Sequence, residues 1–245
     1  MSDTSIDPAE VAKFEAMAQD WWDPDGAARP LHAMNPCRLD YIADQIAGEF
    51  ARDRAASRPF EGLSVLDVGC GGGLLCEPLA RLGAAVTGID AAAGNVAAAR
   101  AHAEMSGLSI QYRAITAEAL AAEGRRFDVV LAMEIVEHVA DPATFLADLA
   151  RLVRPGGLLV ASTLNRTGKS FAAAIVGAEW ILRWLPRGTH DWRRFLTPDE
   201  LEGLMAAGGL DPVDRKGMVP DIVAGTWRLS PRDLSVNYVV TALRR

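Results

Sequence analysis

Cysteine is scarce in this sequence, and positive charge is not in excess. The three cysteines of the 245 residues, Cys37, Cys70 and Cys76, are odd in number and lack the spacing of a zinc site or a disulfide framework. They are expected to be reduced thiols in a cytosolic protein. The 25 Lys and Arg residues are outnumbered by 32 Asp and Glu residues, which leaves a net charge of −7. That charge argues against nucleic acid as a partner, because no broad basic surface is available to meet phosphates.

Long apolar segments are also missing, although 50% of the residues are hydrophobic. No apolar stretch reaches the ~20 residues that a membrane-spanning helix requires. The acidic N-terminus has no apolar signal core. The chain is therefore expected to be cytoplasmic and to form a single domain, residues 1–245, that is large enough to bury a full core.

One βαβ unit organises the sequence. Residues 63–68 are a short, mostly apolar strand that runs into a glycine cluster at 69–73. Residues 74–82 carry leucines at helical spacing, and a second strand at 85–89 ends on Asp90. This order of elements is typical of nucleoside binding. The glycines let the backbone approach the ligand, and the carboxylate accepts hydrogen bonds from ribose hydroxyls.

The spacing of the glycines separates two classes of nucleoside ligand. The dinucleotide pattern Gly-x-Gly-x-x-Gly fails in both possible registers, because Leu74 or Cys76 stands where the third glycine is needed. The sequence satisfies Asp67-x-Gly69-x-Gly71-x-Gly73 instead. This pattern resembles the first motif of S-adenosylmethionine-dependent methyltransferases with a Rossmann-like fold. An NAD-dependent oxidoreductase and an inert binding scaffold remain as alternatives, the first disfavoured by the failed register and the second by the intact motif.

The residues after Asp90 continue to alternate between helix and strand. Helices are expected at 91–106, 141–152 and 197–208, and strands at 110–113, 127–133, 158–163, 213–218 and 236–243. Asp141 and Thr197 are predicted N-caps, and Glu200 completes a capping box with Thr197. The alternation implies an α/β fold, a Rossmann-like doubly wound sheet that is mostly parallel.

The first 60 residues are expected to form an N-terminal helical cap on this sheet. Apolar residues at helical spacing predict an amphipathic helix at 11–21, which ends at Trp21 and Trp22. It is interpreted either as a packing helix or as a lid over the cofactor. A loop at 23–36 and a second helix at 39–51 are expected to follow.

Eight segments carry a closer resemblance to a known family. They are Trp21-Trp22-Asp23, Leu31-His-Ala-Met-Asn-Pro-x-Arg38, Asp67-Val-Gly-Cys-Gly-Gly-Gly73, Met133-Glu-x-x-Glu-His138, Ser162-Thr-Leu-Asn-Arg166, Gly168-Lys-Ser170, Gly188-Thr-His-Asp191 and Val236-Asn-Tyr238. They run almost from end to end of the chain and closely resemble the ubiquinone biosynthesis O-methyltransferases. Many methyltransferases share the glycine motif, whereas the segments at 165–170 and 188–191 are far more specific.

The resemblance implies S-adenosylmethionine as cofactor and supplies its contacts. The expected cofactor residues are Arg38, Asp67, Gly69, Gly71, Asp90, Ala117 and Met133. In this interpretation Arg38 pairs with the methionine carboxylate, and Asp90 takes the ribose hydroxyls. Asp67 supports the loop or the methionine ammonium, Ala117 lies where the adenine would sit, and Met133 offers an apolar wall.

The resemblance also implies the substrates and partners. The family methylates two phenolic hydroxyls of a polyprenylated ring, first on a 2-polyprenyl-6-hydroxyphenol and later on a 3-demethylubiquinol. A small soluble phenol or amine remains as an alternative acceptor. The expected partners are the polyprenylated phenol or quinol and an anionic membrane surface, with other ubiquinone-biosynthesis enzymes as further candidates.

Three acid–base side chains follow the predicted strand at 127–133. Glu134, Glu137 and His138 are spaced i, i+3, i+4 and share one face if this segment is helical, at the sheet edge where α/β folds bind ligands. They are catalytic candidates for removing the phenolic proton, with histidine best tuned to neutral pH. Two alternatives stay open. The three residues hold a divalent cation such as Mg2+ that lowers the pKa of the phenol, or they form a solvated face.

Residues 165–194 interrupt the alternation and are expected to be an insertion with an amphipathic helix. The fifteen residues 171–185 are apolar except for Glu179 and Arg183, and they include Trp180 and Trp184. Basic residues flank them: Arg166, Lys169, Arg187, Arg193 and Arg194. A helix of this length spans ~22 Å, less than the ~30 Å hydrocarbon core. A buried core helix is one interpretation. The indoles and basic flanks favour the other, a mobile docking helix in the membrane interface of a peripheral membrane enzyme.

Overall fold

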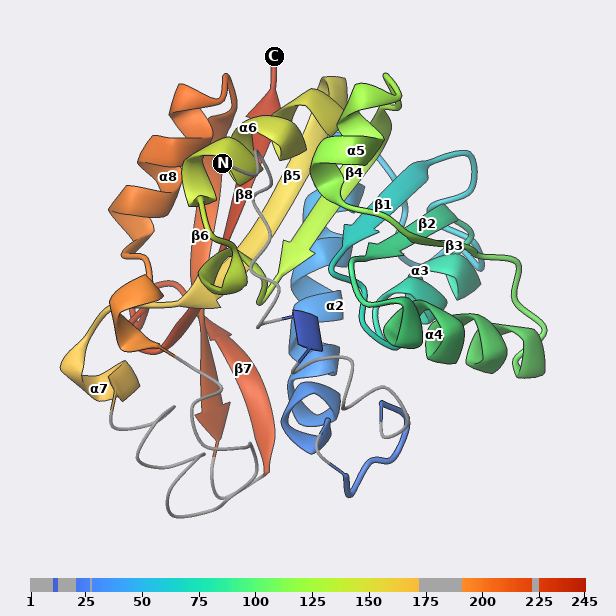
Figure 1. Ribbon diagram of the computed structural model, residues 1–245, viewed down its shortest axis with the longest axis horizontal. Coiled ribbons are helices and arrows are strands. Elements are labelled where there is room, and N and C mark those ends of the chain that lie inside the picture. The colour runs from blue at the N-terminus through green and yellow to red at the C-terminus, as the bar shows by residue number, and fades with distance from the viewer. Residues whose placement is uncertain (1–10, 13–20, 27, 172–190, 222–224) are drawn as a thin grey trace.

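The computed structural model describes residues 11–12, 21–26, 28–171, 191–221 and 225–245. This part of the chain is built on one eight-stranded sheet with the strand order β3-β2-β1-β4-β5-β8-β6-β7 (Figure 1). The strands are β1 (Ser64–Val68), β2 (Ala85–Asp90), β3 (Gln111–Ala114), β4 (Phe127–Met133), β5 (Val153–Leu164), β6 (Asp211–Asp221), β7 (Thr226–Ser230) and β8 (Asn237–Arg244). Strands β1 to β5 pair in parallel, and β6, β7 and β8 pair antiparallel. The predicted doubly wound, mostly parallel sheet is confirmed.

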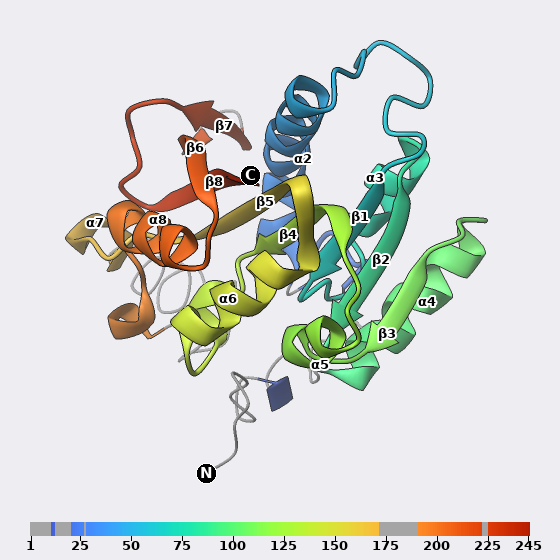
Figure 2. The ribbon, with the colours of Figure 1, turned by 90° about the horizontal axis from the view of Figure 1, so that it is seen from above.

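Helices cover both faces of the sheet. They are α2 (Arg29–Glu49), α3 (Cys76–Arg81), α4 (Ala93–Met105), α5 (Ala117–Ala122), α6 (Pro142–Leu152), α7 (Gly168–Ser170) and α8 (Pro198–Ala207). Buried residues of α2, α3 and α4 form one hydrophobic core with the sheet, and those of α5, α6 and α8 form a second core. Figure 2 shows α2 and α6 on opposite sides of the strands.

Local signals in the sequence place several helix boundaries correctly. Asp141 accepts hydrogen bonds from the backbone nitrogens of Ala143 and Thr144 at the start of α6. Thr197 and Glu200 form the predicted capping box at the start of α8. Each cap satisfies backbone N–H groups that the first turn of a helix leaves without a partner, which explains why these boundaries are readable from the sequence.

The predicted loop at 23–36 is wrong over most of its length. Helix α2 begins at Arg29, with Pro30 in its first turn, and continues through Pro36 to Glu49. A proline inside a helix removes one backbone hydrogen bond and normally ends it. Here the buried residues Met34 and Cys37 on either side of Pro36 anchor the helix to the core. Tertiary burial therefore overrides the local signal that the prediction followed.

The C-terminal strands are longer and more numerous than predicted. Strand β6 extends to Asp221, beyond the predicted end at 218, and Trp227 lies in a further strand, β7, opposite Pro220. Strand β5 begins at Val153 instead of 158, and its pairing with β4 shifts register before Leu158. Glycine and proline in these segments favour turns, but an edge strand and a bulge tolerate both residues.

Two predicted helices fall largely outside the described residues. Of the N-terminal segment 11–21 the structure describes Val11, Ala12 and Trp21, and of the apolar segment 171–185 it describes only Phe171. In the part of the chain that is described, no helix is both long enough and apolar enough to cross a bilayer.

A buried hydroxyl pair joins α2 to the sheet and predicts a stability effect. The Tyr41 and Thr241 hydroxyls lie 2.8 Å apart, and neither side chain is exposed. Tyr41→Phe should lower the free energy of unfolding by ~1–3 kcal/mol, because it leaves the Thr241 hydroxyl buried without this partner. Urea denaturation measures the change. Tyr41→Phe combined with Thr241→Val is the control and should recover part of the loss, and a strictly additive double variant would contradict the assignment.

Candidate active site

The glycine loop is fastened to the end of the neighbouring strand. The carbonyl oxygen of Ile89 accepts hydrogen bonds from the backbone nitrogens of Gly69, at 2.8 Å, and Cys70, at 3.0 Å. The Asp90 carboxylate accepts from the backbone nitrogen of Gly71, at 3.0 Å, and from that of Ala92, at 2.8 Å. The predicted strand–loop–strand unit and its terminal acid are therefore one hydrogen-bonded structure at the carboxyl edge of β1 and β2.

Glycine is required in this loop for both conformation and space. Gly69 and Gly71 have φ angles of +71° and +51°, a region that side chains with a Cβ rarely adopt. A Cβ on Gly69 would lie 2.3 Å from the Cδ1 atom of Ile135. A Cβ on Gly71 would lie 2.5 Å from the Trp21 ring. The loop is thus pressed between a residue that follows β4 and an indole from the N-terminal segment.

Asp67 lies under this loop with its side chain buried. Its carboxylate accepts a hydrogen bond from the thiol of Cys76 at 3.2 Å. Burial raises the pKa of Asp67 to about 7, although the Cys76 hydrogen bond and the charge of Arg38 both act to lower it. A cation placed near Asp67 would favour its ionised form, so the site fits the predicted role beside an ammonium group.

Arg38 projects from α2 and is buried, with 4% of its surface exposed. Its Nη2 atom lies 3.6 Å from Oε1 of Glu134, beyond hydrogen-bond range. Among the described residues, neither its Nε nor its Nη2 atom has a hydrogen-bond partner. A buried guanidinium with unused donors matches a carboxylate ligand, which accepts two parallel hydrogen bonds. The expected contact with a methionine carboxylate therefore fits the structure.

Glu134 is held in an unusual conformation directly after β4. Its φ angle is +54°, and its backbone nitrogen donates to the carbonyl and the hydroxyl oxygen of Ser162. The Ser162 hydroxyl donates to Oε1 of Glu134 at 2.8 Å, and the Asn237 amide donates to Oε2 at 3.2 Å. A strained backbone that several contacts support is typical of functional positions. Ser162 and Asn237 lie in segments that carry the family resemblance, but neither was predicted as a site residue.

The expectation that Glu134, Glu137 and His138 share one helical face is wrong. A short 3-10 helix, η2 (Val136–His138), contains Glu137 and His138 but leaves Glu134 outside. Glu137 is buried, and its Oε2 accepts from the Thr163 hydroxyl at 2.7 Å. Burial raises the pKa of Glu137, opposed by the nearby His138. His138 is only half-buried.

Within the described ranges, no three His, Cys, Asp or Glu side chains come together as a metal-binding group. Glu134, Glu137 and His138 are all described residues and do not form such a group, so the geometry does not favour the Mg2+ alternative.

The remaining predicted cofactor residues lie at the same edge of the sheet. Met133 is the last residue of β4 and pairs with Ser162 of β5. Ala117 begins α5 and is buried. It follows β3, whose last residue, Ala114, pairs with Asp90 of β2. The loop, the acid and these two apolar side chains thus follow the carboxyl ends of β1 to β4, where open α/β sheets bind ligands.

Comparison with known proteins agrees with this geometry. Residues 38–214 match a family described as "Methyltransferase domain". A ubiquinone biosynthesis O-methyltransferase of Cereibacter sphaeroides is 67% identical over 245 residues, covering 100% of this chain and 99% of the relative. One of Roseobacter denitrificans is 61% identical over 241 residues, covering 98% and 97%.

Two solved structures share the fold at low sequence identity. Magnesium protoporphyrin IX methyltransferase from Synechocystis, with bound SAM, has a TM-score of 0.62 at 16% identity and covers 100% of both chains. A possible histamine N-methyltransferase from Thermotoga maritima has a TM-score of 0.63 at 16% identity, covering 96% of this chain and 99% of that chain.

The fold and the edge of the sheet define a Rossmann-like methyltransferase, as the glycine spacing predicted. Within that class, the chain belongs to the ubiquinone biosynthesis O-methyltransferase family, to which 61–67% identity over nearly the whole length assigns it. The resemblance drawn from the eight sequence segments is confirmed.

The buried Asp67 predicts how stability depends on pH. The folded-state pKa is about 7, whereas an unfolded Asp has a pKa near ~3.9. The folded protein therefore binds more protons between these values, and Asp67 lowers stability as pH rises through this window. Asp67→Asn cannot titrate. Its stability relative to the parent protein should increase from pH 4 to pH 7 and stay constant above pH 7.

Urea denaturation of the cofactor-free protein at pH 5 and pH 8 measures this difference. Asp67→Asn should gain more over the parent at pH 8 than at pH 5. An equal difference at the two pH values would show that Asp67 is ionised in the folded state throughout.

Proposed function

We propose that this protein transfers a methyl group from S-adenosylmethionine to phenolic hydroxyls of polyprenylated ubiquinone precursors, at both O-methylation steps. The observation that carries the proposal is the buried Arg38 guanidinium with unused donors, beside the fastened glycine loop and the constrained Glu134. The relatives at 61–67% identity bear the name of this pathway and reaction, which supports the choice of acceptor over another small phenol or amine.

The cofactor supplies an electrophilic methyl group on a sulfonium when it is bound. The chain's own residues then hold it. Arg38 would bind the methionine carboxylate, and Asp67 would face the ammonium. Asp90 would accept from the ribose hydroxyls while it keeps the loop in place through Gly71. Ala117 and Met133 would supply apolar walls.

The phenolic proton must be removed, because a phenol with a pKa of ~10 is mostly neutral at physiological pH. We assign its acceptance to His138, which is half-buried and lies in η2, just after the carboxyl end of β4. Glu137 is buried, and its pKa is influenced by His138. A buried carboxylate beside the imidazole would stabilise the imidazolium that forms. Glu134 would orient the acceptor through the carboxylate that Ser162 and Asn237 fix.

A methyl-transfer assay with a short-tailed 2-prenyl-6-hydroxyphenol tests this assignment. His138→Ala should lower kcat by ~10²- to 10⁴-fold, the usual contribution of a general base, while the affinity for S-adenosylhomocysteine stays within twofold. Glu61→Gln, at an exposed position before β1, is a control and should keep full turnover.

Unchanged turnover in His138→Ala would reject the base assignment. Loss of activity with EDTA and its return with magnesium would favour a cation instead. Equal kcat/KM with a soluble catechol would favour the alternative acceptor.

We also propose that the insertion docks the enzyme on an anionic membrane, where its polyprenyl substrate dissolves. The apolar segment 171–185 lies almost entirely outside the described residues, so the support comes from its composition and from the flanks. Trp180 and Trp184 suit the interface, and the segment is too short to span a bilayer.

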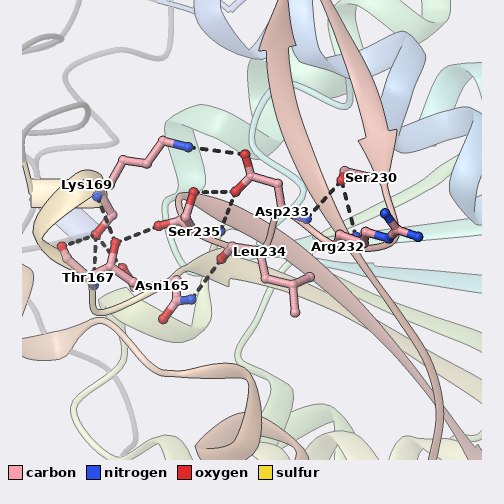
Figure 3. A network of polar contacts seen from close by, with 9 residues as sticks. Asn165, Thr167, Lys169, Ser230, Arg232, Asp233, Leu234 and Ser235 are labelled. Atoms are coloured by element: carbon pink, nitrogen blue, oxygen red, sulfur yellow. Dashed lines mark hydrogen bonds and ion pairs between the residues drawn. The ribbon is translucent and has the colours of Figure 1, made fainter.

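The first residues of the insertion are tied to the loop between β7 and β8. The Asn165 amide donates to the Leu234 carbonyl at 2.8 Å, and the Thr167 hydroxyl donates to the Ser235 carbonyl at 2.6 Å (Figure 3). Lys169 pairs with Asp233 at 3.2 Å. Hydrogen bonds from Ser235 and then the Lys169 charge lower the pKa of Asp233 to about 2. The first described residues of the insertion are therefore held next to β8, which carries Asn237.

These ion pairs reduce the charge that the flank offers to a membrane. Lys169 pairs with Asp233, and Arg166 forms an ion pair with Glu200. A cation near an anionic surface contributes ~1 kcal/mol, but a cation already paired contributes less. Docking should therefore depend more on the indoles than a count of basic residues suggests.

Vesicle sedimentation measures this dependence. Trp180→Glu combined with Trp184→Glu should abolish most binding to vesicles that contain phosphatidylglycerol, and binding of the parent protein should weaken as salt increases. Met105→Glu combined with Val213→Glu adds the same charge at two exposed apolar positions and is the matched control. Equal binding by the two double variants would contradict the docking proposal.

A further inference from the structure

Two adjacent indoles from the N-terminal segment reach the glycine loop. Trp22 donates from Nε1 to the carbonyl oxygen of Gly72 at 2.8 Å. The Trp21 ring is buried and lies against Gly71 and Gly72, where a Cβ on either glycine would come within 2.5 Å of a ring atom. The loop that would hold the cofactor is therefore covered and hydrogen-bonded by residues nearly fifty positions earlier in the chain.

Helix α4 holds both indoles in place. The Trp21 Nε1 atom donates to the side-chain oxygen of Asn95 at 2.8 Å, and Asn95 is itself buried. The Trp22 ring stacks on His102, with ring centroids 3.5 Å apart and planes 4° apart. The His102 Nδ1 atom lies 2.6 Å from the carboxylate of Glu77. Each indole thus has one fixed partner on the same helix.

Hydrophobic packing alone would not require the buried polar groups that support Trp22. Glu77 is 2% exposed and is held by His102 and by Arg81 at 3.1 Å. A buried carboxylate is costly unless it is paired, and apolar residues would fill the same space at less expense. The arrangement orients the His102 ring, and that ring sets the plane of the Trp22 indole whose N–H meets Gly72.

We propose that Trp21 and Trp22 form a clamp that fixes the backbone of Gly71 and Gly72 for cofactor binding, with Asn95 and His102 as its positioning residues. The inference rests on the proposed use of S-adenosylmethionine at this loop. The loop has no rigid side chains of its own, so its conformation depends on the groups pressed against it. The clamp supplies such groups from outside the βαβ unit.

Calorimetric titration with S-adenosylhomocysteine tests the clamp. Trp22→Phe keeps a ring to stack on His102 but loses the N–H that binds Gly72, and it should weaken binding by about 5- to 10-fold. His102→Leu removes the stacking partner and should weaken binding to a similar degree. The double variant should lose no more affinity for S-adenosylhomocysteine than the single variant with the larger loss, because both changes act on one contact.

Trp192→Phe is the matched control. Trp192 also donates from its indole to a backbone carbonyl, that of Thr167 at 3.0 Å. Thr167 follows β5, whereas the glycine loop follows β1, and β4 lies between these two strands in the sheet. The affinity of Trp192→Phe for S-adenosylhomocysteine should stay within twofold of that of the parent protein. Quenching of tryptophan fluorescence by S-adenosylhomocysteine should shrink in Trp22→Phe and persist in Trp192→Phe.

The outcomes separate the two proposals. Parent-like affinity in folded Trp22→Phe and His102→Leu would overturn the clamp, as would an equal loss in Trp192→Phe. Failure of the parent protein to bind S-adenosylhomocysteine would overturn the proposed cofactor instead.

Discussion

The site depends first on the hydrogen bonds that fasten the glycine loop to the end of β2. Ile89 and Asp90 together accept three backbone N–H groups from residues 69–71. Because β2 pairs in parallel with β1, these bonds hold the loop that follows β1 against the carboxyl end of β2. Asp90 therefore has a structural role in the loop in addition to its proposed role in ligand binding. The carboxylate proposed to bind the ribose also holds the backbone beside it, through Gly71 and Ala92.

The charges around this loop are arranged for a ligand more than for the empty protein. Arg38 is buried with unused donors, and Asp67 is buried with a raised pKa although Arg38 lies near enough to oppose the shift. Arg38 forms an ion pair with Glu134 but keeps two nitrogen donors without a hydrogen-bond partner, and Asp67 accepts a hydrogen bond from the Cys76 thiol. A zwitterion that carries a carboxylate and an ammonium group would complement both. Such sites reduce the stability of the free protein in exchange for binding, and this accounts for charged residues inside an otherwise apolar core.

The sequence predicted those features whose signal is local. Strand β4 and helix α6 have the expected boundaries, because an apolar run marks the strand and an Asp-Pro cap marks the helix. The glycine motif and Asp90 were readable for the same reason. Ser162 and Asn237 were missed as supports of Glu134 because they lie 28 and 103 residues away from it in the sequence. Asn95 and His102 were missed for the same reason, since only the folded chain brings them to the indoles.

The pairing of β5 with β8 explains how two halves of different character make one site. The proposed cofactor residues other than Arg38, which lies on α2, lie in or follow the parallel strands β1 to β4. The antiparallel half supplies Asn237 at the start of β8, and the loop before it anchors the insertion proposed to meet the substrate. Leu164 pairs with Asn237 in the register that also brings Ser162 opposite Val239. Glu134 contacts Ser162 and Asn237 from β4, so it lies where the two halves meet. A methyl donor held by one half and an acceptor admitted by the other would come together beside that residue.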